Sequence, residues 1–69
     1  MGVVEDKRYM LRVLEEAGFG FEEYSFLVDD YSIVFKGKAR KIGNIGLALK
    51  YLDDVEVDGN MVKAWLVIP

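Results

Sequence analysis

Apolar residues recur at helical spacing near the start of the chain. They occupy positions i, i+3, i+4 and i+7 of one helix face: Met10, Val13, Leu14 and Ala17. Asp6 suits the N-cap position before this stripe, and Gly18 directly follows it, where glycine commonly ends a helix. The pattern predicts a helix over Lys7–Ala17 with one buried face.

A second helical stripe lies in the later half of the chain and consists of Ile45, Ala48, Leu49 and Leu52. Asn44 precedes it and suits the N-cap position, so we predict a helix over Asn44–Leu52. Leu47 and Tyr51 lie outside the stripe and leave this helix apolar on most sides. Because a small domain covers only one side of a surface helix, we expect these two residues to contact a partner chain.

The segment between the two stripes has the alternation of β-strands. Its inward positions are Tyr24, Phe26 and Val28, followed by Tyr31, Ile33 and Phe35. We predict a hairpin that turns at Asp29-Asp30. A turn there pairs Val28 with Tyr31 and places Glu23 opposite Lys36 on the other face.

Alternation returns after the second stripe. Gly59-Asn60 is a two-residue turn signal between two alternating segments. A hairpin that turns there pairs Val57 with Val62 and places Glu56 opposite Lys63, so apolar and charged faces both agree with this register.

These elements predict a single α+β domain over residues 1–69. In the order αββαββ, the simplest arrangement is a two-layer sandwich in which two helices cover one face of a four-stranded antiparallel sheet. This order resembles a circularly permuted ferredoxin-like fold, whose first strand has moved to the C-terminal end. The resemblance implies that the last strand lies inside the sheet and that the other face of the sheet is open.

The last strand has two distinct faces. The inward face is Val62, Ala64, Leu66 and Ile68, which leaves Met61, Lys63, Trp65 and Val67 on the open face. We predict an interface between copies of the chain, formed either by the outer side of the second helix, with Leu47 and Tyr51, or by the open sheet face, with Met61, Trp65 and Val67. A protein partner of another kind is an alternative, and the sequence assigns no contact residues to it.

Charge is distributed unevenly along the chain. Tyr31–Leu52 contains five Lys or Arg residues and no acid, whereas the rest carries four basic and twelve acidic residues, for a total of −3. Lysine and arginine in the glycine-rich segment 36–46 therefore indicate a site for an anion, such as phosphate or single-stranded nucleic acid. The predicted site comprises Lys38, Arg40, Lys41, Gly43, Asn44 and Trp65.

The loop before the second helix has a spacing of known type. Gly43-Asn44-Ile45-Gly46 resembles the Gly-x-x-Gly loop of KH RNA-binding domains. In those domains a helix leads into the loop, whereas a predicted strand does so here, so we transfer no RNA-binding residue from the resemblance. The structural alternative is that these glycines let the chain turn and the helix pack closely.

The chain lacks the residues on which most catalytic and metal sites depend. It contains no cysteine and no histidine, and its two serines therefore have no histidine to activate them. We expect no disulfide, no metal, no cofactor, no enzymatic activity, no membrane insertion and a cytoplasmic location. The resulting hypothesis is a small interaction module that forms a homo-oligomer, with anion or nucleic-acid binding as the alternative.

Overall fold

The computed structural model describes residues 2–68 and shows an α+β fold with an antiparallel sheet and two helices. Its elements are α1 (Val3–Glu16), β1 (Gly20–Val28), β2 (Ser32–Lys41), α2 (Ile45–Leu49), β3 (Asp54–Asp58) and β4 (Met61–Val67). Within the described residues, neither helix has the length and apolar character needed to cross a membrane.

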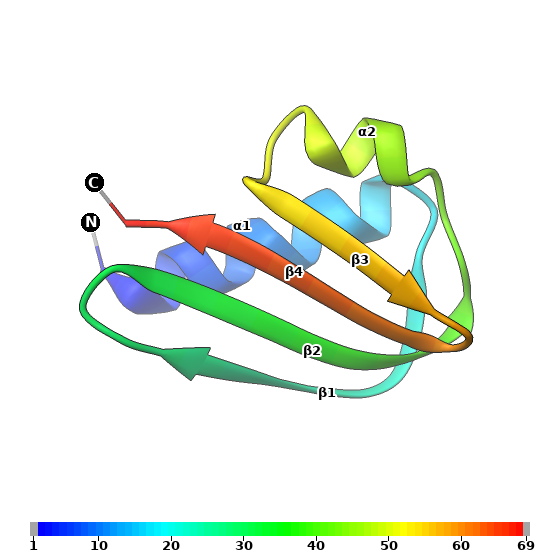
Figure 1. Cartoon of the computed structure of the whole chain (residues 1–69), viewed down its shortest axis with the longest axis horizontal. Coiled ribbons are helices and arrows are strands. Elements are labelled where there is room, and N and C mark those ends of the chain that lie inside the picture. The colour runs from blue at the N-terminus through cyan, green and yellow to red at the C-terminus, as the bar shows by residue number, and fades with distance from the viewer. Residues whose placement is uncertain (1, 69) are drawn as a thin grey trace.

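The sheet has the strand order β1-β2-β4-β3, and each pair of neighbouring strands is antiparallel. The last strand, β4, therefore lies between β2 and β3. Figure 1 shows α1 running behind the sheet and α2 lying beside β3 at the top. β1 and β3 form the two edges of the sheet.

A single hydrophobic core joins both helices to one face of the sheet. Its fully buried side chains are Met10, Leu14, Ile33, Phe35, Ala48, Val62 and Ala64. Alternate residues of β2 and β4 enter this core, so the intervening residues lie on the opposite, open face. Leu66 and Ile68 pack against the core while only partly buried.

Helix α1 buries the predicted stripe but begins earlier than predicted. The carbonyl of Gly2 accepts the N–H groups of Glu5 and Asp6 at 3.1 and 3.2 Å, so Asp6 lies in the first turn and is not the N-cap. Gly18 ends the helix as predicted, at φ 99°. Its N–H and that of Phe19 donate to carbonyls of the last helical turn, which is the Schellman arrangement.

The register predicted for the first hairpin is wrong by two residues. Val28 pairs with Ile33 and not with Tyr31, and consequently Glu23 lies opposite Lys38 and not Lys36. The Asp29 carboxylate accepts the backbone N–H groups of Tyr31 and Ser32, both at 2.8 Å, which centres the turn on Asp30-Tyr31. A shift of two residues preserves the two faces of each strand, so the core remains as the alternation predicts.

The second hairpin has the predicted register. Val57 pairs with Val62 and Glu56 pairs with Lys63. Gly59 occupies the turn at φ 61°, a conformation that glycine adopts without strain. Agreement between the turn dipeptide and the apolar alternation made this register predictable.

Helix α2 ends after Leu49, three residues earlier than predicted. The N–H of Asp53 already donates to the carbonyl of Trp65 at 2.9 Å, so the chain must reach the sheet by this point. Lys50 and Tyr51 close the last turn with tighter bonds to carbonyls three residues back. The side chain of Asn44 caps the helix as predicted, because its oxygen accepts the N–H of Leu47 at 3.1 Å.

Replacing Asp29 with asparagine is expected to reduce the acid sensitivity of the fold. Hydrogen bonds from the N–H groups of Tyr31 and then Ser32 lower the pKa of Asp29. A lowered folded pKa stabilises the protein above the unfolded pKa of about 4, and this contribution is lost as the pH falls through the folded pKa. Thermal unfolding of both proteins between about pH 7 and about pH 2 measures the effect. A difference in melting temperature that is independent of pH would contradict it.

Candidate functional site

The side chains on the open face of the sheet form three levels. In each level the strand register places one residue from each strand side by side, in the order β1, β2, β4 and β3. The first level is Leu27, Val34, Trp65 and Asp54. The second is Ser25, Lys36, Lys63 and Glu56. The third is Glu23, Lys38, Met61 and Asp58. Every level therefore ends in an acid on β3, and two of them carry lysine on β2.

Two lysines lie directly opposite each other in the middle of this face. Lys36 on β2 pairs with Lys63 on β4, although like charges in this position destabilise a sheet. Within residues 2–68 the single ion pair shorter than 4.0 Å joins Lys38 to Glu22, at 3.4 Å. The charges of Lys36 and Lys63 thus have no ion-pair partner in the described part of the chain.

Apolar side chains surround these charges. Leu27, Met61 and Val67 are 63%, 45% and 56% exposed, and Val34 and Trp65 are half-buried. A shallow hollow of about 390 Å³ lies beside them, with Ser25, Lys36, Lys38 and Met61 among its walls. The face thus combines exposed apolar area with separated charge, which is the composition of a contact surface.

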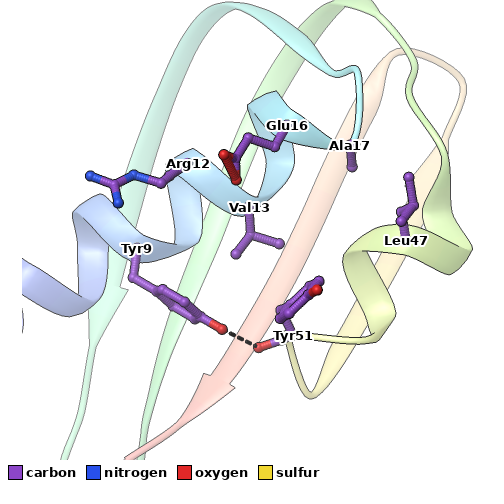
Figure 2. A pocket seen from close by; sticks show the side chains of 7 residues that line it. All are labelled: Tyr9, Arg12, Val13, Glu16, Ala17, Leu47 and Tyr51. Atoms are coloured by element: carbon purple, nitrogen blue, oxygen red, sulfur yellow. Dashed lines mark hydrogen bonds between the residues drawn. The ribbon is translucent and has the colours of Figure 1, made fainter.

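A groove between α1 and α2 forms a second candidate surface, on the helical side of the molecule. It has a volume of about 370 Å³, with Val13 and Ala17 on one side and Leu47 and Tyr51 on the other (Figure 2). The Tyr9 hydroxyl donates a hydrogen bond to the carbonyl oxygen of Tyr51 at 3.3 Å and closes one end. Leu47 and Tyr51 are both exposed, so this side of α2 is open to contact.

The predicted interface residues therefore divide between two surfaces. Leu47 and Tyr51 line the groove on the helical side, whereas Met61, Trp65 and Val67 lie on the opposite side of the sheet. One flat partner surface cannot contact both groups at once. Each surface has to be considered separately.

The glycine-rich loop is explained by packing. A Cβ atom on Gly43 would lie 2.7 Å from the carbonyl carbon of Gly18 and from a ring carbon of Phe19, and closer still to the carbonyl oxygen of Ala17. The N–H of Asn44 donates to that same Ala17 oxygen at 2.8 Å, and its side chain caps α2. Both residues thus connect the end of α1 to the start of α2.

The structure does not bring the predicted anion-binding residues together. Lys38 and Trp65 lie on the open face at different levels, and strand alternation places Arg40 on this face beyond the pairing with β4. Alternation places Lys41 on the helical side of β2. The helix that follows Asn44 has only five residues.

Strand alternation correctly placed Lys36 and Lys63 on the open face, but it did not show that they pair directly. The acidic row formed on β3 by Asp54, Glu56 and Asp58 was not predicted as a feature of this face. Alternation alone assigns these side chains to this face. Their proximity depends on β4 lying between β2 and β3, which only the strand order shows.

Comparisons of the chain with protein-family models, with curated proteins and with solved structures find no match.

Proposed function

We propose that the protein is a small, non-enzymatic interaction module of the cytoplasm that forms a homodimer through the open face of its sheet. The observation that carries the proposal is the separation of charge across this face. Glu56 and Asp58 lie on β3, and Lys36 and Lys38 lie at the same levels on β2, with β4 between them. Such a face is complementary to a second copy of itself.

A two-fold axis parallel to β4, lying between two stacked sheets, satisfies this complementarity. It places β3 of one copy over β2 of the other, so that Glu56 faces Lys36 and Asp58 faces Lys38 across the dimer. The two Lys63 side chains then face each other on the axis, and the Glu56 carboxylates of both copies lie on either side of them. Stacked sheets are about 10 Å apart, a distance that lysine and glutamate side chains span together.

Apolar residues lie on both sides of Lys63 at the centre of this dimer. The axis brings Met61 and Trp65 of β4 against the same residues of the second copy, and Val67 extends the contact. Three strands overlap in this dimer, and a face of three strands with about seven residues each measures about 14 by 23 Å, or roughly 330 Å². Because standard interfaces bury roughly 800 Å² per partner, we expect a weak dimer with a micromolar dissociation constant.

The strand order supports a related proposal about the fold. The order β1-β2-β4-β3 is the one that a ferredoxin-like sheet acquires when its first strand moves to the C-terminal end. A shared core for both helices agrees with this interpretation. In such an arrangement the second sheet face is left free for a partner.

Charge reversal tests the dimer directly. Lys36→Glu and Glu56→Lys are each expected to be monomeric at concentrations where the unaltered protein dimerises, because each variant opposes like charges across the axis. In an equimolar mixture, the reversed charges attract at both contacts, so we expect a heterodimer. Sedimentation velocity and native mass spectrometry measure these masses.

Lys50→Glu is the matched control, because it makes the same charge change on the C-cap of α2, away from the sheet face. This variant is expected to dimerise normally. The proposal is wrong if the unaltered protein stays monomeric at several hundred micromolar, or if the mixture of the two charge variants contains no heterodimer.

Binding of single-stranded nucleic acid to the same face is a second candidate. The Lys36–Lys63 pair beside Trp65 favours it, since adjacent cations hold phosphates and an aromatic ring stacks bases. Here Lys36→Glu should weaken binding and Glu56→Lys should strengthen it, with Trp65 fluorescence as the signal. Unchanged fluorescence with mixed oligonucleotides at low salt would exclude this candidate.

A further inference from the structure

The outer edge of β1 has unpaired backbone and an unusual charge pattern. Among residues 2–68, β1 pairs only with β2, and Figure 1 shows no helix or strand beyond it. The regular part of the strand, Tyr24–Val28, contains no charged residue, and its Tyr24, Leu27 and Val28 side chains are exposed. An uncharged, exposed edge of this kind is a template for pairing with another strand.

Acidic pairs flank this uncharged segment on both sides. Glu22-Glu23 precedes it and Asp29-Asp30 follows it. Among the described residues, Glu22 alone of these four forms an ion pair, with Lys38. The other three carboxylates have no ion-pair partner among the described residues. Arg40 and Lys41 of β2 lie near the Glu22-Glu23 end, so the uncompensated negative charge is greatest at Asp29-Asp30.

These flanks oppose pairing of β1 with a second copy. Antiparallel pairing of Tyr24–Val28 with itself is centred on Phe26, which places Glu23 opposite Asp29 and Glu22 opposite Asp30 of the other chain. Like charges in opposite positions destabilise strand pairs, and this register has them at both ends. The edge is therefore protected against self-pairing while its centre stays available.

We propose that the β1 edge binds an extended peptide segment of a partner protein that has an apolar, strand-forming centre and basic residues on both sides. Backbone hydrogen bonds to Tyr24–Val28 would add a strand to the sheet. Basic flanks would then meet Glu23 at one end and Asp29 and Asp30 at the other. This inference does not depend on the open-face dimer, in which the β1 edge remains free.

Two synthetic peptides with the same centre test the proposal. Both contain Val-Thr-Val-Thr-Val, flanked at each end by two lysines in one peptide and by two glutamates in the other. We expect the lysine-flanked peptide to bind at least about tenfold more tightly, and the preference to shrink with added salt. The backbone amide signals of Tyr24–Val28 should shift on binding.

A charge variant provides an independent measurement. In the double variant Glu23→Lys/Asp30→Lys, opposite charges face each other in the self-paired register, so we expect a dimer paired through β1. The variant is also expected to lose its preference for the lysine-flanked peptide, because each acidic pair then contains one lysine. Performing the titrations in the Glu56→Lys background separates the edge from the open face, because Glu56 lies on the opposite edge strand. Equal affinity for the two peptides, or chemical-shift changes confined to β3 and Trp65, would overturn the proposal.

Discussion

Phe35→Ala is expected to lower the free energy of unfolding by about 3–5 kcal/mol. Phe35 is fully buried, and its ring centroid lies 4.8 Å from Phe21, 5.6 Å from Tyr24 and 5.4 Å from Phe26. Truncation removes one side of each aromatic contact and leaves a cavity in the centre of the core. A domain of 69 residues is stable by only about 3–10 kcal/mol, so this variant should be largely unfolded or close to it.

Urea unfolding followed by Trp65 fluorescence and circular dichroism measures this effect. Leu27→Ala serves as the control, because Leu27 lies on the neighbouring strand and is 63% exposed. Its substitution should change the free energy of unfolding by less than about 1 kcal/mol. Equal effects of the two substitutions would mean that the aromatic cluster is not the centre of the core.

Gly43→Ala is expected to destabilise the protein by about 3 kcal/mol, at the upper end of the range for overpacked sites. The new methyl group would overlap the backbone of Ala17 and Gly18. That backbone cannot move freely, because Gly18 ends α1 and the Ala17 carbonyl accepts the N–H of Asn44. The substitution therefore separates the two helices or breaks this hydrogen bond.

Gly20→Ala is the matched control for this prediction. A Cβ atom there would lie 3.7 Å from the Cβ of Lys41, an ordinary contact. Alanine in a strand is favoured over glycine by roughly 0.5–1 kcal/mol, so this variant should be as stable as the unaltered protein or slightly more stable. Chemical denaturation of the two alanine variants at one protein concentration gives the comparison, and a fully stable Gly43→Ala protein would contradict the packing role of this glycine.

Agreement between local signals predicted the register of the second hairpin correctly and that of the first hairpin wrongly. At Gly59-Asn60, turn chemistry and alternation indicate the same register, and the structure has it. At Asp29-Asp30 the turn dipeptide, the alternation and the Glu23–Lys36 charge pair also agreed, and the register was still wrong. The Asp29 side chain caps the N–H groups of Tyr31 and Ser32 and moves the turn by one residue, and the resulting two-residue shift leaves both faces unchanged. Side-chain capping of this kind depends on three-dimensional geometry and leaves little trace in apolar periodicity.

The candidate surfaces were predictable only in part. Alternation correctly assigned Met61, Trp65 and Val67 to the face opposite the core. It could not show that Gly43 is required for a close approach of two helix ends, because that contact joins residues far apart in the chain. The juxtaposition of Lys36 and Lys63 likewise depends on non-local strand pairing, which is set by the whole sheet.

The position of β4 also has a consequence for synthesis of the chain on the ribosome. β2 and β3 do not pair with each other within residues 2–68, and both pair with β4, which is synthesised after the other three strands. Until Met61–Val67 has emerged from the ribosome, β1 and β2 can form their hairpin, but β3 has no strand to pair with. The sheet that supports the core is therefore incomplete. Folding is therefore expected to follow translation of these residues, and the apolar surface of β2 stays exposed to chaperones until then.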